Sequence, residues 1–310
     1  MQTFNTKSNI AVYYELTKPK IWYLLVFTAF GAAVTASNVF NVPISLATWA
    51  LLLGGVAAGS AAAANTLTNY HDRDIDAIME RTKNRPIPSK RIYPPEKARN
   101  FGLLLAAISL VCAFGICLTA SFWQGILAGS FMAFGLVDNI LVYSYGLKRK
   151  SRTNIVLGGF SGGAPAMIGY VAVTTTGLWD FGLVIAGLVF VWIPMHIWAL
   201  TLHFKDDYKK VNVPMLTAVQ SEKTSARIIA GTTLMMVLFS VVPFFLTHDN
   251  GEPLMHEVYL YTAIASGVLM VLLSFWVVAK PSEKASWVLF KFSSPYLAVL
   301  FIALMVDSVL

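Results

Sequence analysis

The chain has 310 residues, of which 13% are charged and 56% hydrophobic, and its mean hydropathy is +0.64. A soluble globular protein carries about 25% charged residues, so this composition excludes a soluble globule and indicates a polytopic membrane protein. The formal net charge of +7 would suggest nucleic acid binding in a soluble chain. In a membrane protein, basic residues instead indicate which side of the bilayer a segment occupies, and we expect no nucleic acid partner.

Nine apolar runs are long enough to cross a membrane, because a spanning helix needs about 20 mostly apolar residues. We therefore predict an all-α bundle of about nine transmembrane helices, forming a single domain over residues 1–310. Lys291 and Pro295 interrupt the last predicted span. The predicted spans are residues 19–37, 44–70, 101–119, 124–144, 155–176, 181–202, 228–247, 257–279 and 287–310.

The distribution of basic residues supports this topology. With nine spans and a cytoplasmic N-terminus, all 23 Lys and Arg residues fall in segments on the inner side. The outer loops carry acidic residues instead, namely Asp180, Asp249, Glu252 and Glu257. Lys and Arg are enriched in cytoplasmic loops, so we expect a multi-pass protein of the cell membrane with its N-terminus in the cytoplasm.

The first long inner loop, NTLTNYHDRDIDAIMERTKNRPIPSKRI, is rich in carboxylates and bases. If the helix before it continues, Asn65, Asn69, Asp72 and Asp76 share one face, because their spacing is i, i+4, i+7 and i+11. Asp74 points elsewhere. Carboxylates with an amide oxygen are ligands that Mg²⁺ prefers when phosphate oxygens complete its shell.

Bases follow this predicted metal site directly. Arg81, Lys83 and Arg85 are donors suited to phosphate oxygens, so a metal site and an anion site would adjoin. In the alternative interpretation, these acids and bases form a solvated, self-paired helix end at the lipid headgroups.

The second long inner loop, HFKDDYKKVNVPMLTAV, repeats the pattern on the same predicted side, with Asp206 and Asp207 beside Lys205, Lys209 and Lys210. Two acidic pairs could hold two Mg²⁺ ions on opposite sides of one diphosphate. A third inner loop, LKRKSRTN, supplies Lys148, Arg149, Lys150 and Arg152. Ordinary anchoring on the positive side of the membrane accounts for most of those four residues.

These segments resemble a known family. NYHDRDIDAIMERTKNRP is similar to the first aspartate-rich motif of the UbiA-type intramembrane prenyltransferases. LKRKSRTNIVLGGFSGGAPAMIGYVAVT, the Pro194-Met195-His196 segment and DDYKKVNVPMLTAV resemble the protoheme IX farnesyltransferase (haem O synthase) branch. The similarity runs from about Leu16 to the seventh span.

The resemblance implies a helical bundle around a cavity that opens to the cytoplasmic side, with Mg²⁺ as cofactor. It implies transfer of a farnesyl group from farnesyl diphosphate to a vinyl group of haem B, with addition of water, giving haem O and diphosphate. The protein is expected to be embedded in, and to contact, the lipid bilayer. The resemblance does not identify a protein partner, whether a terminal oxidase or a haem A synthase.

Site residues follow from matching this chain to the family motifs. Asp72 and Asp76 match the metal-binding aspartates, and Asp206 or Asp207 matches the second acidic motif. The family pattern places an Asn where this chain has Thr68, with Asn69 one position later, so either could contact the metal. Arg85 and Lys83 are expected to act on the departing diphosphate. Further substrate contacts are expected from Thr68, Asn69, Arg73, Arg81, Lys148, Arg149, Lys205 and Tyr208.

The sequence leaves more than one role possible for His196 and for Tyr208. His196 lies within the sixth span beside Pro194. An intramembrane histidine is a functional candidate by default: it could contact the haem iron or a propionate, transfer a proton, or only link two helices. Tyr208 could line a prenyl channel, or be an interfacial belt residue.

Two other functions remain open at this stage. A UbiA-type enzyme could use another acceptor, such as a quinone-precursor aromatic acid or a glycerol-phosphate lipid. A secondary transporter could use the same carboxylates for ion coupling. Transporter sites generally lie near the bilayer midplane, whereas these acids lie at the basic edge, which favours the enzyme.

Overall fold

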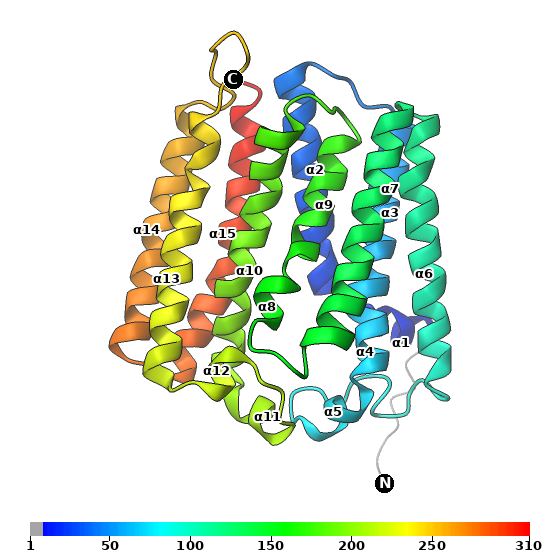
Figure 1. Ribbon diagram of the computed structural model, residues 1–310, viewed down its shortest axis with the longest axis vertical. Coiled ribbons are helices and arrows are strands. Elements are labelled where there is room, and N and C mark those ends of the chain that lie inside the picture. Colours follow the sequence, from blue (N-terminus) through cyan, green and yellow to red (C-terminus); the bar gives the residue numbers. More distant parts are fainter. Residues whose placement is uncertain (1–8) are drawn as a thin grey trace.

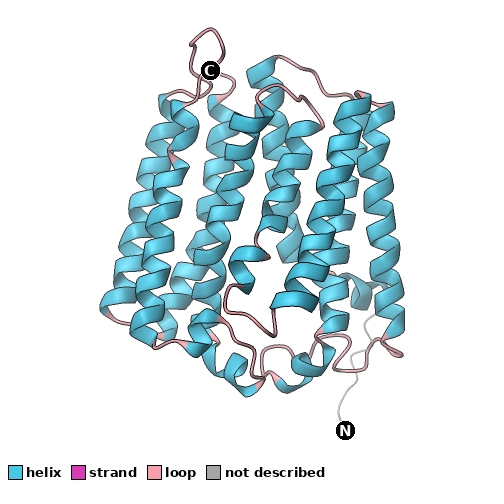
Figure 2. Cartoon of the chain, in the orientation of Figure 1, coloured by secondary structure: helices cyan, strands magenta, loops and turns pink. Residues whose placement is uncertain are grey.

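The computed structural model describes residues 9–310, apart from the side chains of residues 62–64. This part of the chain is a bundle of helices without a β-strand; it has one isolated bridge, between Thr247 and Pro253 (Figures 1 and 2). The predicted all-α architecture is confirmed.

The long helices run roughly parallel to one another along the bundle (Figure 1). They are α2 (Pro19–Phe40), α3 (Leu46–Ser60), α6 (Glu96–Gly115), α7 (Phe122–Val137), α10 (Leu183–His203), α13 (Glu222–Ser240), α14 (Glu257–Ala279) and α15 (Glu283–Asp307). Two of them continue into π-helical segments, α3 into η1 (Ala61–Leu67) and α7 into η3 (Asp138–Leu147). Two others are followed by short 3₁₀-helices, α6 by η2 (Ile116–Leu118) and α13 by η5 (Val242–Phe245). A further π-helical segment, η4 (Leu178–Gly182), precedes α10. The short helices are α1 (Asn9–Leu16), α4 (Thr68–His71), α5 (Arg73–Ile78), α8 (Asn154–Leu157), α9 (Phe160–Val171), α11 (Lys205–Lys210) and α12 (Leu216–Val219).

Eight helical segments in residues 9–310 are long and apolar enough to cross a membrane. They match eight of the nine predicted spans, including the last one, which stays helical through Lys291 and Pro295 as α15. Many large apolar side chains of these helices are exposed, among them Leu103, Leu118, Leu272 and Phe275. Such an exposed apolar surface is costly in water and favourable in lipid.

The fifth predicted span, 155–176, is not one continuous helix. It consists of α8 and α9, which are separated at Gly158 and Gly159. Helix α9 packs against α2, α7 and α10 inside the bundle. The count of nine crossings therefore stays a prediction, since the described fifth segment is interrupted. Consistent with an odd number, α1 and Leu310 lie at opposite ends of the bundle (Figure 1).

Glycine permits the close approach of α9 to its neighbours. A Cβ added at Gly169 would lie 2.1 Å from the carbonyl oxygen of Ala29 in α2, and one at Gly162 would lie 2.1 Å from Cδ1 of Ile193 in α10. Both distances are far below van der Waals contact, so a side chain there would push the helices apart. The glycine-rich sequence is thus explained by helix packing.

The break before α9 exposes amides that need acceptors, because the first four N–H groups of a helix have no partner within it. The buried carboxylate of Asp138, at the start of η3, accepts a hydrogen bond from the backbone amide of Ser161 at 2.8 Å. An anion at this end also interacts favourably with the helix dipole. Asp138 therefore caps α9 from a neighbouring segment.

The two long acidic loops lie at one end of the bundle, which we call the basic end. Helices α1, α5, α11 and α12 all lie there (Figure 1). The prediction that the two acidic loops emerge on the same side is confirmed.

We predict that Asp138→Ala lowers the free energy of unfolding by about 1–2 kcal/mol, because an N-terminal amide of α9 loses its acceptor inside the bundle. Thermal unfolding of the purified protein in detergent measures this. Asp138→Asn keeps an acceptor oxygen and should lose less. An alanine variant as stable as the wild type would rule out the capping role.

Candidate active site

The first acidic motif lies where a long helix changes its winding. Helix α3 passes into the π-turns of η1 and then α4, and the chain breaks at Asp72, whose backbone has φ −87° and ψ 6°. Segments of π-helix occur frequently at functional sites. Asn65, Asn69, Asp72 and Asp76 all have buried side chains, as the predicted shared face requires, and the intervening Thr66, Leu67 and Thr68 are buried as well. The side chain of Asp74 is 61% exposed.

Asp76 and Asn69 converge on one cation. Nη1 of Arg85 donates to Oδ2 of Asp76 at 2.7 Å and to Oδ1 of Asn69 at 3.2 Å. Nδ2 of Asn69 donates to the carbonyl of Leu16 at 3.1 Å, which fixes the orientation of the amide. Of the two candidates for the Asn position of the family pattern, Asn69 is the one that shares Arg85 with Asp76, whereas the hydroxyl of Thr68 contacts Ser144 in η3 at 3.2 Å.

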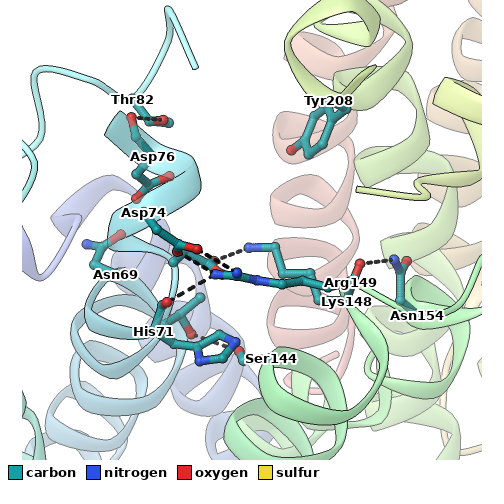
Figure 3. Close-up of polar contacts among 12 residues, drawn as sticks. Asn69, His71, Asp74, Asp76, Thr82, Ser144, Lys148, Arg149, Asn154 and Tyr208 are labelled. Atoms are coloured by element: carbon teal, nitrogen blue, oxygen red, sulfur yellow. Dashed lines mark hydrogen bonds and ion pairs between the residues drawn. The ribbon is translucent and has the colours of Figure 1, made fainter. Parts of the chain in front are cut away.

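Asp72 meets the third inner loop. Nζ of Lys148, just after η3, forms an ion pair with Oδ2 of Asp72. Arg149 binds both oxygens of Asp74 at 2.7 Å and the carbonyl of His71 at 3.1 Å (Figure 3). Two of the four basic residues of this loop therefore contact the acidic motif, where the sequence interpretation had assigned most of them to anchoring.

These charges shift one another's pKa. The hydrogen bonds from Arg149 lower the pKa of Asp74 to about 2. Burial acts to lower the pKa of Lys148, but the influence of Tyr143 and Asp72 outweighs it and leaves that pKa above its ordinary value. Lys148 therefore stays a cation at neutral pH.

The two aspartates of the second acidic motif have different environments. The carboxylate of Asp207 is buried and accepts hydrogen bonds from the backbone amides of Glu80 at 3.3 Å and Arg81 at 3.1 Å. The side chain of Asp206 is 82% exposed and lies 3.8 Å from Lys209. Asp207 thus holds the loop after α5 in place, and the structure does not bring Asp206 to the buried acids.

Other predicted residues are distributed around this loop. Nη2 of Arg81 donates to the hydroxyl of the buried Tyr208 at 3.3 Å. Lys83 pairs with Glu80 at 2.5 Å, and Lys205 lies 3.8 Å from Glu222. Arg73 contacts the carbonyl and the ring of Tyr70. The structure therefore places Arg85 and Lys148 at the buried acids, and turns Arg73, Lys83 and Lys205 toward other partners.

A cavity of about 520 Å³ lies inside the bundle. Its lining is mostly apolar, with Lys20, Ser60, Asn139, Tyr143, Ser161 and His196 among the polar exceptions. Tyr143 also lies 5.7 Å from Nζ of Lys148, measured to the ring centroid. One wall of the cavity is therefore next to the cation that pairs with Asp72, and another includes His196. A volume in this range suits a bound small molecule.

Lys18 is a basic residue that the predicted site did not include. It lies between α1 and α2 in a left-handed conformation, with φ 49° and ψ 66°. Burial and the neighbouring Arg85 and Lys148 lower its pKa, while Asp76 acts to raise it. These interactions place its ammonium among the charges of the site. The Lys-Pro pair at the start of a span was the signal available in the sequence.

The buried oxygens fit a magnesium ion. Oδ1 of Asn65 is buried without a hydrogen-bond partner among the described residues. Oδ1 of Asp72 accepts no hydrogen bond there either, although Nη2 of Arg149 lies 3.5 Å from it as an ion-pair partner. A buried polar atom without a partner costs free energy, and such an atom in a native structure calls for a ligand or an ion. The described residues contain no group of three or more His, Cys, Asp or Glu side chains that could hold a metal alone. Two carboxylates with amide oxygens are instead the donor set that Mg²⁺ uses when phosphate supplies further ligands.

The comparison with known families gives a match over residues 24–303 to the UbiA prenyltransferase family. The chain belongs to this family. Protoheme IX farnesyltransferase 2 of Cenarchaeum symbiosum is 67% identical over 308 residues, covering 99% of both chains. A protoheme IX farnesyltransferase of Thermoplasma volcanium is 39% identical, over 96% of this chain and 98% of that one. The resemblance to the farnesyltransferase branch is confirmed.

Solved structures share the fold. A digeranylgeranylglyceryl phosphate synthase superposes with a TM-score of 0.72 at 18% identity, covering 97% of this chain and 98% of that one. A UbiA homologue from Archaeoglobus fulgidus bound to DMAPP and Mg²⁺ gives 0.60 at 16% identity, covering 96% and 98%. At these identities the likeness establishes a common polytopic helical architecture.

We predict different effects for the two adjacent acids of α11. Asp207→Ala should speed amide hydrogen exchange at Glu80 and Arg81 by about tenfold or more, since each amide loses an acceptor in a partly buried loop. Asp206→Ala is the matched control and should leave exchange unchanged, because an exposed pair contributes little. Equal exchange in all three proteins would show that Asp207 does not hold the loop.

Proposed function

We propose that this protein transfers a farnesyl group from farnesyl diphosphate to a vinyl group of haem B, with addition of water, to give haem O and diphosphate. The observation that carries the proposal is a pair of buried carboxylates bound to two partly buried cations, one of which lies 5.7 Å from the ring of Tyr143 in the wall of an apolar cavity of about 520 Å³. An ionic head and a long apolar tail are the two parts of an isoprenyl diphosphate. The acceptor follows from the relative that is 67% identical over 99% of both chains.

We assign the metal to Asp72 and Asp76, with the amide oxygens of Asn69 and Asn65 beside them. When bound there, Mg²⁺ supplies positive charge that favours departure of the diphosphate. Mg²⁺ dependence is supported by the buried oxygens of Asn65 and Asp72 that accept no hydrogen bond, and by the Mg²⁺-bound homologue of the same fold. Asp207 supports this site by holding the loop that carries Arg81 and Arg85.

The cations of the chain act on the leaving group. Lys148 and Arg85 lie against the carboxylates, so their charges are already placed where the diphosphate would bind. Charges fixed in a site that excludes water stabilise developing negative charge without reorganisation during the reaction. Arg149, which binds Asp74, and Arg81, on the loop held by Asp207, add positive charge around the acidic motif.

The apolar cavity protects the reacting carbon. Departure of diphosphate leaves an allylic cation, which the vinyl group attacks; water then adds to the resulting cation. Free water would quench the first cation, and a water-excluding site prevents such side reactions. The lining by Leu24, Leu25, Phe131, Ile168 and Ile197 supplies this exclusion.

The arrangement of basic residues also supports a cellular location and a membrane orientation for the protein. We propose a single domain over the whole chain, a multi-pass protein of the cell membrane, with the N-terminus and the site on the cytoplasmic side. The support is that α5 and α11, which lie at the same end of the bundle (Figure 1), belong to loops rich in Lys and Arg, as expected of cytoplasmic segments.

We predict that Asp72→Ala folds but reduces haem O formation by at least about 100-fold, the scale seen when an enzyme loses one preorganised electrostatic contact. The assay is mass spectrometry of haem after incubation of purified protein with farnesyl diphosphate, haem B and Mg²⁺. Asp206→Ala serves as the control and should stay close to wild type. Near wild-type turnover by Asp72→Ala would overturn the metal assignment.

A second prediction concerns the acceptor. Labelled farnesyl diphosphate should label haem when membranes containing the protein receive haem B. Quinone-precursor aromatic acids and glycerol-phosphate lipids should stay unlabelled. Label found only in one of these other products would replace haem B as the acceptor, while leaving prenyl transfer in place.

A further inference from the structure

His196 has a fixed position on the wall of the cavity. It lies on α10 one turn after Trp192, and its ring stacks on Trp192 with centroids 4.0 Å apart and planes at 24°. Phe290 of α15 lies on it at 4.4 Å and 30°. The ring therefore lies between two aromatic side chains from different helices, while His196 still lines the cavity.

The contacts of Ser293 favour one tautomer of His196. Nδ1 of His196 lies 2.6 Å from Oγ of Ser293, and the same Oγ lies 2.7 Å from the carbonyl oxygen of Phe290. That carbonyl can only accept, so when the hydroxyl donates to it, the hydroxyl accepts from the imidazole. This arrangement satisfies all three groups with the proton on Nδ1 and a lone pair on Nε2.

The second contact of Ser293 strengthens this arrangement. The indole Nε1 of Trp192 donates to the backbone carbonyl of Ser293 at 2.8 Å. Thus α10 and α15 are joined on both sides of the imidazole. The one hydrogen bond of the His196 ring among the described residues is through Nδ1, which leaves Nε2 without one there.

A lone pair on Nε2 could take a proton or a metal ion. Among the residues that line the cavity, Lys20 and Tyr143 are the other titratable groups, and no carboxylate is among them. A proton taken up by His196 would thus create a buried imidazolium without a counter-ion, which is costly. Coordination to a metal needs the neutral ring that the structure provides.

The surroundings of Nδ1 are those of a metal-binding histidine. Such histidines almost always donate their other N–H to an acceptor, which fixes the tautomer and the ring orientation. Neutral imidazole is also a common axial ligand of haem iron. We propose that Nε2 of His196 is an axial ligand to the iron of the porphyrin acceptor in the cavity. This inference rests on the proposed function and specifies how the acceptor is held.

The bond needs no other reactant. The Nε2 lone pair forms a coordinate bond to iron and displaces water or another weak ligand. The proton stays on Nδ1, and the oxidation state of iron does not change. Since iron is held at the ring centre, the role of His196 is to position the porphyrin relative to the allylic carbon.

The test compares porphyrins with and without iron. Purified full-length wild type, His196→Gln and His203→Gln are titrated with ferric haem and with metal-free protoporphyrin IX, following absorption and electron paramagnetic resonance. His203 is the matched control, because it also lies on α10, stacks on Trp287 at 4.6 Å and bonds through Nδ1 to a carbonyl oxygen.

We expect the wild type and His203→Gln to give the spectra of histidine-ligated haem. His196→Gln should lose those spectra and bind ferric haem at least about tenfold more weakly, with unchanged affinity for metal-free protoporphyrin. Ser293→Ala should keep the ligation and weaken haem binding by about tenfold, because Nδ1 loses its acceptor.

Two results would overturn the inference. One is a histidine-ligated spectrum in His196→Gln, and the other is an equal loss of affinity for both porphyrins in that variant. Mass spectrometry of the wild-type product tests the proposed function separately. If haem O forms and His196→Gln keeps the histidine spectrum, the ligand assignment fails while the farnesyl transfer stands.

Discussion

The structure depends on the neutralisation of two carboxylates buried inside a membrane bundle. A buried charge without a partner is very costly, and Asp72 and Asp76 each receive a cation from a separate part of the chain. Lys148 comes from the end of η3, and Arg85 comes from the loop after α5. These pairs require the two segments to lie at one end of the bundle, and Asp207 holds the second of them through backbone amides.

Because these ion pairs gather at one end of the bundle, the charged side chains lie apart from the apolar lining of the cavity. The ionic cluster lies in the loops of the basic end, whereas the neighbouring cavity, which Tyr143 joins to Lys148, has mostly apolar walls. An isoprenyl diphosphate likewise consists of a charged head and an apolar chain. The interrupted fifth segment contributes to the cavity, because Gly158, Gly162 and Pro165 of the α8–α9 region line it. Its break in turn depends on Asp138, which caps α9 from η3.

The sequence predicted the features that depend on composition and spacing. Apolar length predicted eight of the membrane helices, and the i, i+4, i+7, i+11 spacing predicted the shared burial of Asn65, Asn69, Asp72 and Asp76. The sequence could not predict contacts between segments that are far apart along the chain. Spacing could not show that Asp207 binds the amides of Glu80 and Arg81, or that Lys148 reaches Asp72. Nor could hydropathy detect the break at Gly158, because a broken apolar segment has the same composition as a continuous one.

The measurement closest to the central claim is anomalous diffraction from crystals of the protein with Mn²⁺ in place of Mg²⁺ and an unreactive farnesyl thiodiphosphate. If the buried acids form a metal-diphosphate site, the anomalous peak lies within coordination distance of Asp72 and Asp76, with the thiodiphosphate beside Lys148 and Arg85 and the prenyl chain in the cavity. A peak at the exposed Asp206, or a thiodiphosphate bound away from the two buried carboxylates, would contradict the account.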